Sequence, residues 1–303
     1  MKSWSAGILP AFLLLASPVM GGCSAKEKAM RAAVTSITSG TSTMGRDDDP
    51  ELIRDSIPFG LTTMESLYDD MPDHPGLLLA LVSGYTQYAY AYIQQDADML
   101  KYDDYDRYRE GRQRAHRMYK RAFRYGLEGL DLVVPGFREA LKADPEGTLN
   151  KLGPEHVQLI YWTGAAWGGA ISTRPEDLEL LADLPRVRAL LNRGMVLDED
   201  FDAGAFHELF ISLDMAPAGG GATSARAHFE RALVLSEGKK AGTYISFAES
   251  VLVAEQDGEG FDAMLEKALA IDPDQYIDYR LVNLLSQKKA RFLQAHREDL
   301  FGG

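Results

Sequence analysis

The chain has 303 residues, of which 46% are hydrophobic and 25% charged, a balance typical of a globular protein with a sizeable core. Its 32 Lys and Arg stand against 45 Asp and Glu, so the net charge is -13 and nucleic acid is not expected as a partner. Its single cysteine rules out an internal disulfide bond.

The first residues have the order of a secretory signal, with a basic start, an apolar run over residues 8–19 and small residues that end at Cys23. The apolar run is shorter than the about 20 residues of a spanning helix. Two glycines directly before Cys23 resemble a bacterial lipobox, although Met20 stands where Leu is expected. We expect residues 1–22 to be a cleaved lipoprotein signal peptide and Cys23 to carry lipid, with a buried free thiol or a later cleavage as alternatives.

Residues 23–49 are small and polar and end in an acidic run, which predicts a flexible tether. Acyl chains on Cys23 would hold the protein at a membrane, because each buried CH₂ group contributes about 0.8 kcal/mol. The sequence thus predicts a lipid-anchored protein on the periplasmic face of the cell envelope. Ser24, directly after the lipidated cysteine, favours the outer membrane over the inner.

Residues 50–303 show helical periodicity and no convincing alternating strand pattern, which predicts a single all-α domain. Longer helices are expected at about 76–97 and 103–132. The first of these contains "GYTQYAYAYIQ", in which Tyr85, Tyr88 and Tyr92 share one helical face.

The stretch "HVQLIYWTGAAWGGAIST" predicts a further helix at 154–173 that is too weakly hydrophobic to span a membrane. Each of its glycines costs roughly 1 kcal/mol in a helix interior, so we expect Gly164, Gly168 and Gly169 to allow close packing of a neighbouring helix.

Six aromatic residues on these two helices are candidates to line a ligand cavity or pore. They are Tyr85, Tyr88, Tyr92, Tyr161, Trp162 and Trp167. The alternative is ordinary core packing, in which each large ring contributes a few kcal/mol.

An internal repeat follows in the C-terminal half. The segments "VRALLNRGMVLDED", "ARAHFERALVLSEG" and "FDAMLEKALAIDPD" align on Gly194, Ala232 and Ala268, which are 38 and 36 residues apart. Each segment places apolar residues on one helical face around a small residue, as in the second helix of a tetratricopeptide repeat. The predicted fold is therefore a tetratricopeptide-like array of stacked antiparallel helix pairs.

Enzyme motifs are incomplete in this chain. His207 and Glu208 begin a zinc-protease pattern, but Ile211 stands where the second zinc ligand belongs. Neither a phosphate-binding loop nor a nucleophile elbow occurs. We expect no catalytic residues, no metal site and no cofactor.

The motifs "GYTQYAYAYIQ", "LIYWTGAAWGGAIS" and "ADLPRVRALLNRGMVLDEDFDAGAFHELFIS" together resemble the TatT component family of TRAP transporters, over roughly residues 50–300. The resemblance implies a periplasmic, usually lipid-anchored helical-repeat protein that associates with the extracytoplasmic substrate-binding subunit. It also implies homo-oligomers, a trimer among them, with apolar cavities that lead toward the bound partner.

The predicted function is an accessory transport component that binds the substrate-binding protein and helps to transfer a small organic or hydrophobic ligand. The alternative is a tetratricopeptide scaffold lipoprotein for outer-membrane or envelope protein assembly, which would bind peptides without a small ligand. An envelope hydrolase is the third possibility.

Overall fold

The computed structural model describes residues 28, 31–32, 34–35, 43–217 and 219–302. Within those residues every regular element is a helix, which confirms the all-α prediction. No described helix is both long enough and apolar enough to cross a membrane. The predicted signal peptide, Cys23 and much of the predicted tether lie outside the described residues.

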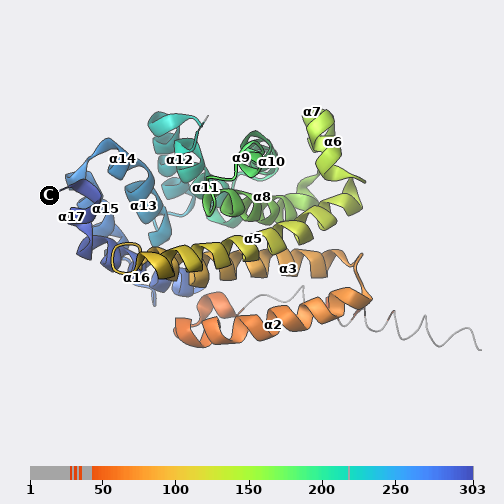
Figure 1. The fold of residues 1–303 in the computed structure, drawn as a ribbon, viewed down its shortest axis with the longest axis horizontal. Helices are drawn as coiled ribbons and strands as arrows, with labels where there is room; N and C mark the ends of the chain where they lie inside the picture. The colour runs from red at the N-terminus through yellow and green to blue at the C-terminus, as the bar shows by residue number, and fades with distance from the viewer. Residues whose placement is uncertain (1–27, 29–30, 33, 36–42, 218, 303) are drawn as a thin grey trace, which may run out of the picture.

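The N-terminal half contains the longest helices of the chain (Figure 1). Its elements are the 3₁₀ turn η1 (Met44–Arg46), α2 (Pro50–Asp70), α3 (Pro75–Tyr88), the π-helical η2 (Ala89–Gln94), α4 (Gln95–Asp98), α5 (Tyr105–Val133), α6 (Phe137–Ala143), α7 (Pro145–Leu149), the 3₁₀ turn η3 (Pro154–His156) and α8 (Val157–Ser172). The three long helices predicted here are confirmed: α3, η2 and α4 follow one another without a break, α5 is the second, and η3 with α8 is the third.

The C-terminal half has shorter helices. Its elements are α9 (Leu178–Leu181), α10 (Leu184–Leu197), the 3₁₀ turn η4 (Phe201–Ala203), α11 (Ala205–Met215), α12 (Gly221–Leu235), α13 (Ala241–Phe247), the π-helical η5 (Ala248–Leu252), α14 (Val253–Glu255), α15 (Gly258–Ala270), the 3₁₀ turn η6 (Ile277–Tyr279), α16 (Arg280–Ala295) and α17 (Arg297–Phe301).

Acidic residues start several of these helices. The Asp49 carboxylate accepts hydrogen bonds from the backbone N–H groups of Glu51 and Leu52, and Pro50 occupies the first helical position of α2. Asp104 caps α5 and Asp257 caps α15 in the same way. Such caps satisfy donors that have no partner inside the helix, so the sequence itself sets these starting points.

The helices pack mainly on their neighbours in the chain. Contacts run from α2 to α3, to α5, to α8 and to α10, and then through α11, α12, α13 and α15 to α16. The three repeat anchors are buried in α10, α12 and α15. A Cβ atom at Gly194 would overlap the Phe206 ring of α11, so this close approach requires glycine. The result is a helical array whose packing is consistent with a helical-repeat architecture.

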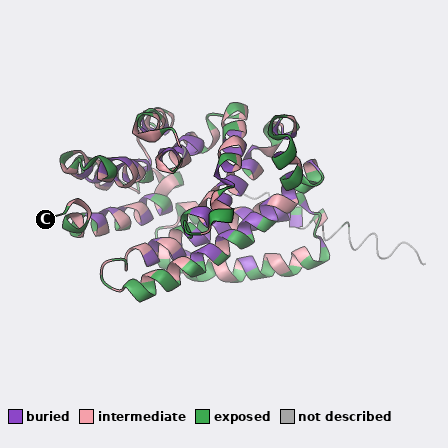
Figure 2. Cartoon of the chain, turned by 45° about the horizontal axis from the view of Figure 1, so that its top comes forward, coloured by how far each residue is buried: buried purple, intermediate pink, exposed green. Residues whose placement is uncertain are grey.

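Figure 2 colours the buried residues purple. Those that are apolar form two core clusters. The first joins α2 to α11, and the second joins α11 to α16. Helix α11 serves both, because Phe206 and Phe210 belong to the first cluster and Ile211 to the second. Helix α16 also reaches back, since its Leu281 and Leu285 pack in the first cluster. The last long helix thus covers the first ones.

Ion pairs accompany this return of α16. Arg46 Nη2 lies 2.7 Å from Asp278 Oδ1, and Lys288 Nζ lies 3.3 Å from Asp96 Oδ1. Both pairs are at least partly exposed to solvent, so each adds little free energy of folding. They nevertheless bring residues about 200 positions apart in the chain into contact.

Part of the region before residue 50 also contacts the body. Val34 is 3% exposed and belongs to the first cluster, and Arg31 Nη2 lies 2.8 Å from Asp73 Oδ1. Thr35 Oγ1 shares a hydrogen bond with His74 Nε2. The division into a tether at 23–49 and a domain at 50–303 stays a prediction.

Candidate functional site

Three tyrosines from separate helices interact electrostatically. Tyr90 comes from η2, Tyr119 from α5 and Tyr161 from α8. The Tyr90 phenol is close enough to act electrostatically on both of the others, and Tyr90 itself is 51% exposed. We call these three residues the tyrosine tract. Tyr90 therefore faces solvent, whereas Tyr119 is buried and its hydroxyl group donates a hydrogen bond to Gln94 Oε1.

The phenols of the tract resist ionisation. Burial, followed by the Tyr90 phenol and Asp98, raises the pKa of Tyr119 well above its ordinary value. Burial, followed by Glu208, raises the pKa of Tyr161 in the same way. Both groups therefore remain neutral at physiological pH, where a phenol can donate a hydrogen bond.

The Tyr161 ring is fixed by other aromatic rings. Trp162 lies edge-on at 4.9 Å between ring centroids, Phe201 at 5.2 Å and Phe206 at 5.3 Å. Tyr161 and Trp162 both remain partly exposed. This part of α8 thus offers a rigid and partly accessible aromatic surface.

A charged cluster lies at one end of the tract. Lys240 Nζ is 3.6 Å from Glu208 Oε2 and 3.6 Å from Asp202 Oδ2, and Thr243 donates a hydrogen bond to Glu208. Burial raises the pKa of Glu208, although Lys240 and Thr243 act against this. Asp202 has φ 43°, a strained conformation that the hydrogen bond from Lys240 to its carbonyl oxygen helps to hold.

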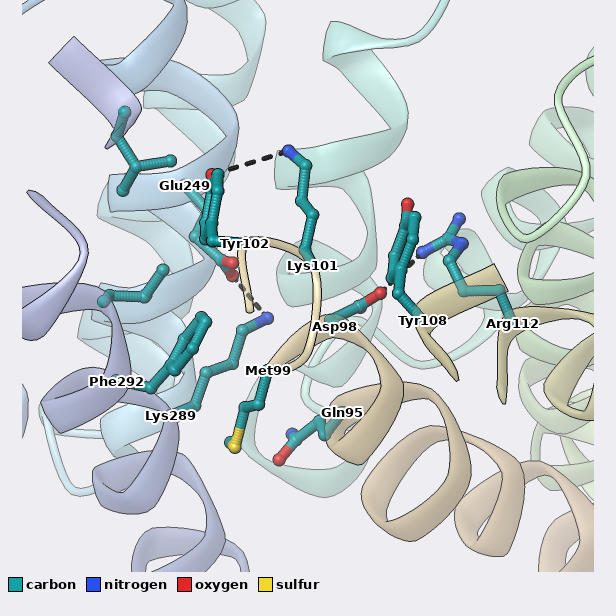
Figure 3. A pocket seen from close by; sticks show the side chains of 12 residues that line it. Gln95, Asp98, Met99, Lys101, Tyr102, Tyr108, Arg112, Glu249, Lys289 and Phe292 are labelled. Carbon is teal, nitrogen blue, oxygen red and sulfur yellow. Dashed lines mark hydrogen bonds and ion pairs between the residues drawn. The ribbon is translucent and has the colours of Figure 1, made fainter. Parts of the chain in front are cut away.

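A second charged cluster lies at the other end, in a pocket of about 220 Å³ between the α4–α5 loop, η5 and α16 (Figure 3). Lys289 Nζ lies 2.5 Å from Glu249 Oε2. Burial opposes the charge of Lys289, but Glu249 and then Tyr90 outweigh it, so the pKa of Lys289 is raised. The Tyr90 phenol thus acts electrostatically on a residue of this pocket.

Four of the six aromatic residues singled out from the sequence are buried in the core. Trp167 is fully buried and stacks on Phe123 at 4.6 Å between centroids. Tyr85, Tyr88 and Tyr92 are at most 8% exposed, and burial raises the pKa of Tyr92 to about 12. Only Tyr161 and Trp162 reach partly exposed positions. A lining role for the six residues stays a prediction.

The three glycines of α8 have different surroundings. A Cβ atom at Gly164 would lie 2.7 Å from Leu191 Cγ of α10, and one at Gly169 would lie 2.7 Å from Tyr119 Cδ1 of α5. At Gly168 the nearest atom would be Val187 Cγ1 at 3.9 Å, an ordinary contact.

Sequence reasoning missed Tyr90, Lys289 and the Glu208–Lys240 cluster. The signal for Tyr90 lies in "YAYAYIQ", where it falls on the helical face opposite Tyr85, Tyr88 and Tyr92. The charged residues carry no comparable signal, because their partners are distant in the chain.

The residues that the structure describes contain no group of three or more His, Cys, Asp or Glu arranged to hold a metal ion. His207 and His228 do meet, with 2.8 Å between their Nδ1 atoms. His207 also contacts Glu199, at 3.2 Å.

Stacked helical arrays often present extended binding surfaces. The chain belongs to the TRAP transporter T-component family, whose family model matches residues 46–301. An uncharacterized protein of Treponema pallidum (strain Nichols) is 31% identical over 262 residues, which cover 84% of this chain and 81% of the relative.

Family membership confirms the resemblance drawn from the sequence motifs. It implies an accessory role in a TRAP transport system and a periplasmic or envelope location.

Proposed function

We propose that this protein is an envelope lipoprotein that binds the extracytoplasmic substrate-binding protein of a TRAP system and helps to transfer a small organic or hydrophobic ligand. The observation that carries the proposal is the accessible aromatic surface of Tyr90, Tyr161 and Trp162, which lies near the Glu208–Lys240 and Glu249–Lys289 ion pairs. Ring faces suit the apolar part of a ligand, and neutral hydroxyl groups suit its polar part.

Transfer requires that a ligand be held weakly enough to leave again. Tyr90 offers a single accessible ring and hydroxyl group, so a ligand beside it stays partly hydrated. The protein would present the ligand and would make or break no covalent bond. Such a role agrees with an accessory transport family.

Lipid on Cys23 would hold the protein on the periplasmic face of the envelope, with Ser24 favouring the outer membrane. A homo-oligomer, a trimer in particular, is part of the same proposal. The molecular mass of the purified protein, measured by light scattering, tests the oligomer. Loss of membrane association in Cys23→Ala tests the anchor.

Co-purification tests the main proposal. The full-length protein, extracted from membranes, should retain the substrate-binding protein of its own TRAP system. Tyr90→Ala should keep that partner and weaken ligand transfer, because the change removes an accessible ring without opening the core. Tyr105→Ala is the matched control, since Tyr105 is 62% exposed and lies outside the tract.

Two results would speak against the proposal. Recovery of envelope assembly proteins in place of the substrate-binding protein would favour the scaffold role. Equal transfer by wild type and Tyr90→Ala would remove the tract from the mechanism.

A further inference from the structure

Helix α5 carries a stripe of cations in a chain that is acidic as a whole. Between residues 105 and 124, eight residues are Arg or Lys and two are Asp or Glu, so this segment has a charge of +6 in a chain of net charge -13. Seven of the eight cations are exposed, and we call these seven the basic stripe. They are Arg107, Arg109, Arg114, Arg117, Lys120, Arg121 and Arg124.

The basic stripe follows one face of the helix. Five of its arginines are separated by seven, three, four and three positions, which is the spacing of neighbours on a helix surface. At 1.5 Å per residue the stripe is about 25 Å long. Helix α5 packs on α3 and α8 (Figure 1), and the stripe lies on the side that these helices leave exposed.

Most of the charge in the basic stripe is not neutralised within the protein. Arg121 Nε lies 3.6 Å from Glu65 Oε1, and Arg124 Nη1 lies 3.4 Å from Glu128 Oε1. Among the described residues, the other five cations of the stripe have no carboxylate at ion-pair distance. Like charges three or four positions apart destabilise a helix, so the fold does not account for this row.

We propose that the basic stripe docks on the phosphate headgroups of an anionic membrane surface. A guanidinium group binds phosphate through two parallel N–H donors, and six of the seven cations are arginines. Tyrosine rings hold two of them in place. Arg121 Cζ lies 5.3 Å from the ring centroid of Tyr85, and Arg124 Cζ lies 4.3 Å from that of Tyr125.

The acidic remainder of the chain does not prevent this contact. Charges are screened over about 8 Å at physiological ionic strength, so groups at the membrane surface outweigh groups further away. Repulsion of the acidic parts turns them away from the same surface. The stripe would therefore fix which side of the helical array faces the membrane.

The predicted lipid anchor begins near one end of the stripe. Cys23 is eight residues before Arg31, a distance of at most about 29 Å along the chain. Arg31 Nη2 lies 2.8 Å from Asp73 Oδ1, in the turn after α2. Near the end of α2, the ring centroid of Tyr68 lies 6.0 Å from Arg124 Cζ. Lipid and stripe can thus reach one membrane, and in this respect the inference rests on the proposed lipoprotein role.

Co-sedimentation with vesicles tests the stripe. The mature chain without lipid, residues 24–303, contains every described residue. It should bind vesicles of phosphatidylglycerol and phosphatidylcholine in equal parts at least tenfold more tightly than vesicles of phosphatidylcholine alone. Raising NaCl from about 0.1 M to about 1 M shortens the screening length from about 10 Å to about 3 Å and should release the protein.

The triple variant Arg114→Gln, Arg117→Gln, Lys120→Gln should bind the mixed vesicles about a hundredfold more weakly, because each cation near an anionic surface contributes about a fivefold factor. Gln has nearly the helix propensity of Arg and Lys, so α5 should remain folded. Thermal unfolding verifies this.

The matched control is Lys151→Gln, Lys267→Gln, Arg291→Gln, which removes the same charge from exposed positions outside α5. It should leave vesicle binding unchanged. Equal binding by wild type and the α5 variant, or equal binding to both kinds of vesicle, would overturn the proposal. An α5 variant that keeps its vesicle binding but loses the substrate-binding protein would also overturn it and would assign the stripe to a protein partner.

The salt dependence separates this inference from the proposed anchor. A lipid-free chain that does not bind anionic vesicles refutes the docking role of the stripe alone. A Cys23→Ala protein that stays on membranes at about 1 M NaCl, where the stripe is screened, refutes the lipid anchor alone.

Discussion

At the scale of the residue, one side-chain type serves two purposes in this protein. Trp167 and Trp162 belong to the same helix, yet Trp167 is fully buried and Trp162 is partly exposed. The Trp167 indole N–H has no hydrogen-bond partner among the described residues, so this side chain stabilises the fold through its ring alone. Its contribution is that of a core residue.

Trp167→Ala should therefore lower the free energy of unfolding by about 3 to 5 kcal/mol, as expected when a large buried ring leaves a cavity. Trp162→Ala should cost clearly less, because part of that ring is already in solvent. Urea unfolding followed by far-UV circular dichroism measures both. If Trp167→Ala reduced ligand binding and left stability unchanged, Trp167 would be a lining residue after all.

The His207–His228 pair predicts a dependence of stability on pH. Burial lowers the pKa of both imidazoles below their ordinary value of 6.5. Below that pH the unfolded chain binds more protons than the folded one, so the stabilising effect is complete above pH 6.5 and is lost as pH falls.

Urea midpoints between about pH 7.5 and pH 5.5 measure this effect. The double variant His207→Gln, His228→Gln should lose less stability on acidification than the wild type does. An identical loss in both proteins would show that the pair does not control the pH dependence.

At the scale of the element, α8 illustrates how glycine position decides helix contact. Gly164 and Gly169 face side chains of α10 and α5, whereas Gly168 has room for a methyl group. The helix therefore carries glycines with opposite effects on stability. Two of them allow neighbouring helices to approach, and the third mainly weakens the helix.

Gly169→Ala should destabilise the protein by about 1 to 3 kcal/mol, because the new methyl group would overlap the rigid Tyr119 ring. Gly168→Ala, the control on the same helix, should stabilise it by about 0.5 to 1 kcal/mol. Thermal or urea unfolding checks the opposite signs. Equal effects of the two changes would contradict the packing seen at α8.

At the scale of the whole molecule, two core clusters share α11 and are joined by α16. A helical array whose helices contact only their neighbours in the chain can unfold in parts. A last helix that packs back on the first helices couples the two ends of the array. The packing of Leu281 and Leu285 against the first cluster therefore predicts a single unfolding transition.

Phe261→Ala tests this coupling. Phe261 is fully buried in the second cluster, and its loss should cost about 3 to 5 kcal/mol. Because Trp162 and Trp167 report on the first cluster, their fluorescence midpoint should fall together with the circular dichroism midpoint. A fluorescence midpoint that stays in place would indicate two independent units.

Much of the fold could be predicted, because helix periodicity and caps are local properties. The runs that became α3, α5 and α8 were recognisable from apolar spacing, and the repeat anchors in α10, α12 and α15 from their small residues. The candidate site was harder to predict. Tyr90 and Tyr88 are chemically alike and two positions apart, and only the packing of α3 and η2 decides which one is buried.

Sequence alone determined the helical class, the family and the apolar stripe of each helix, because a helix interacts mainly with residues within four positions of itself. Tertiary structure alone decided which aromatic faces remain accessible and which charges meet. Lys289 and Glu249, Lys240 and Glu208, and Tyr90 and Tyr161 come from separate elements of the chain. Their proximity depends on how the helices pack on one another, and no local pattern encodes that packing.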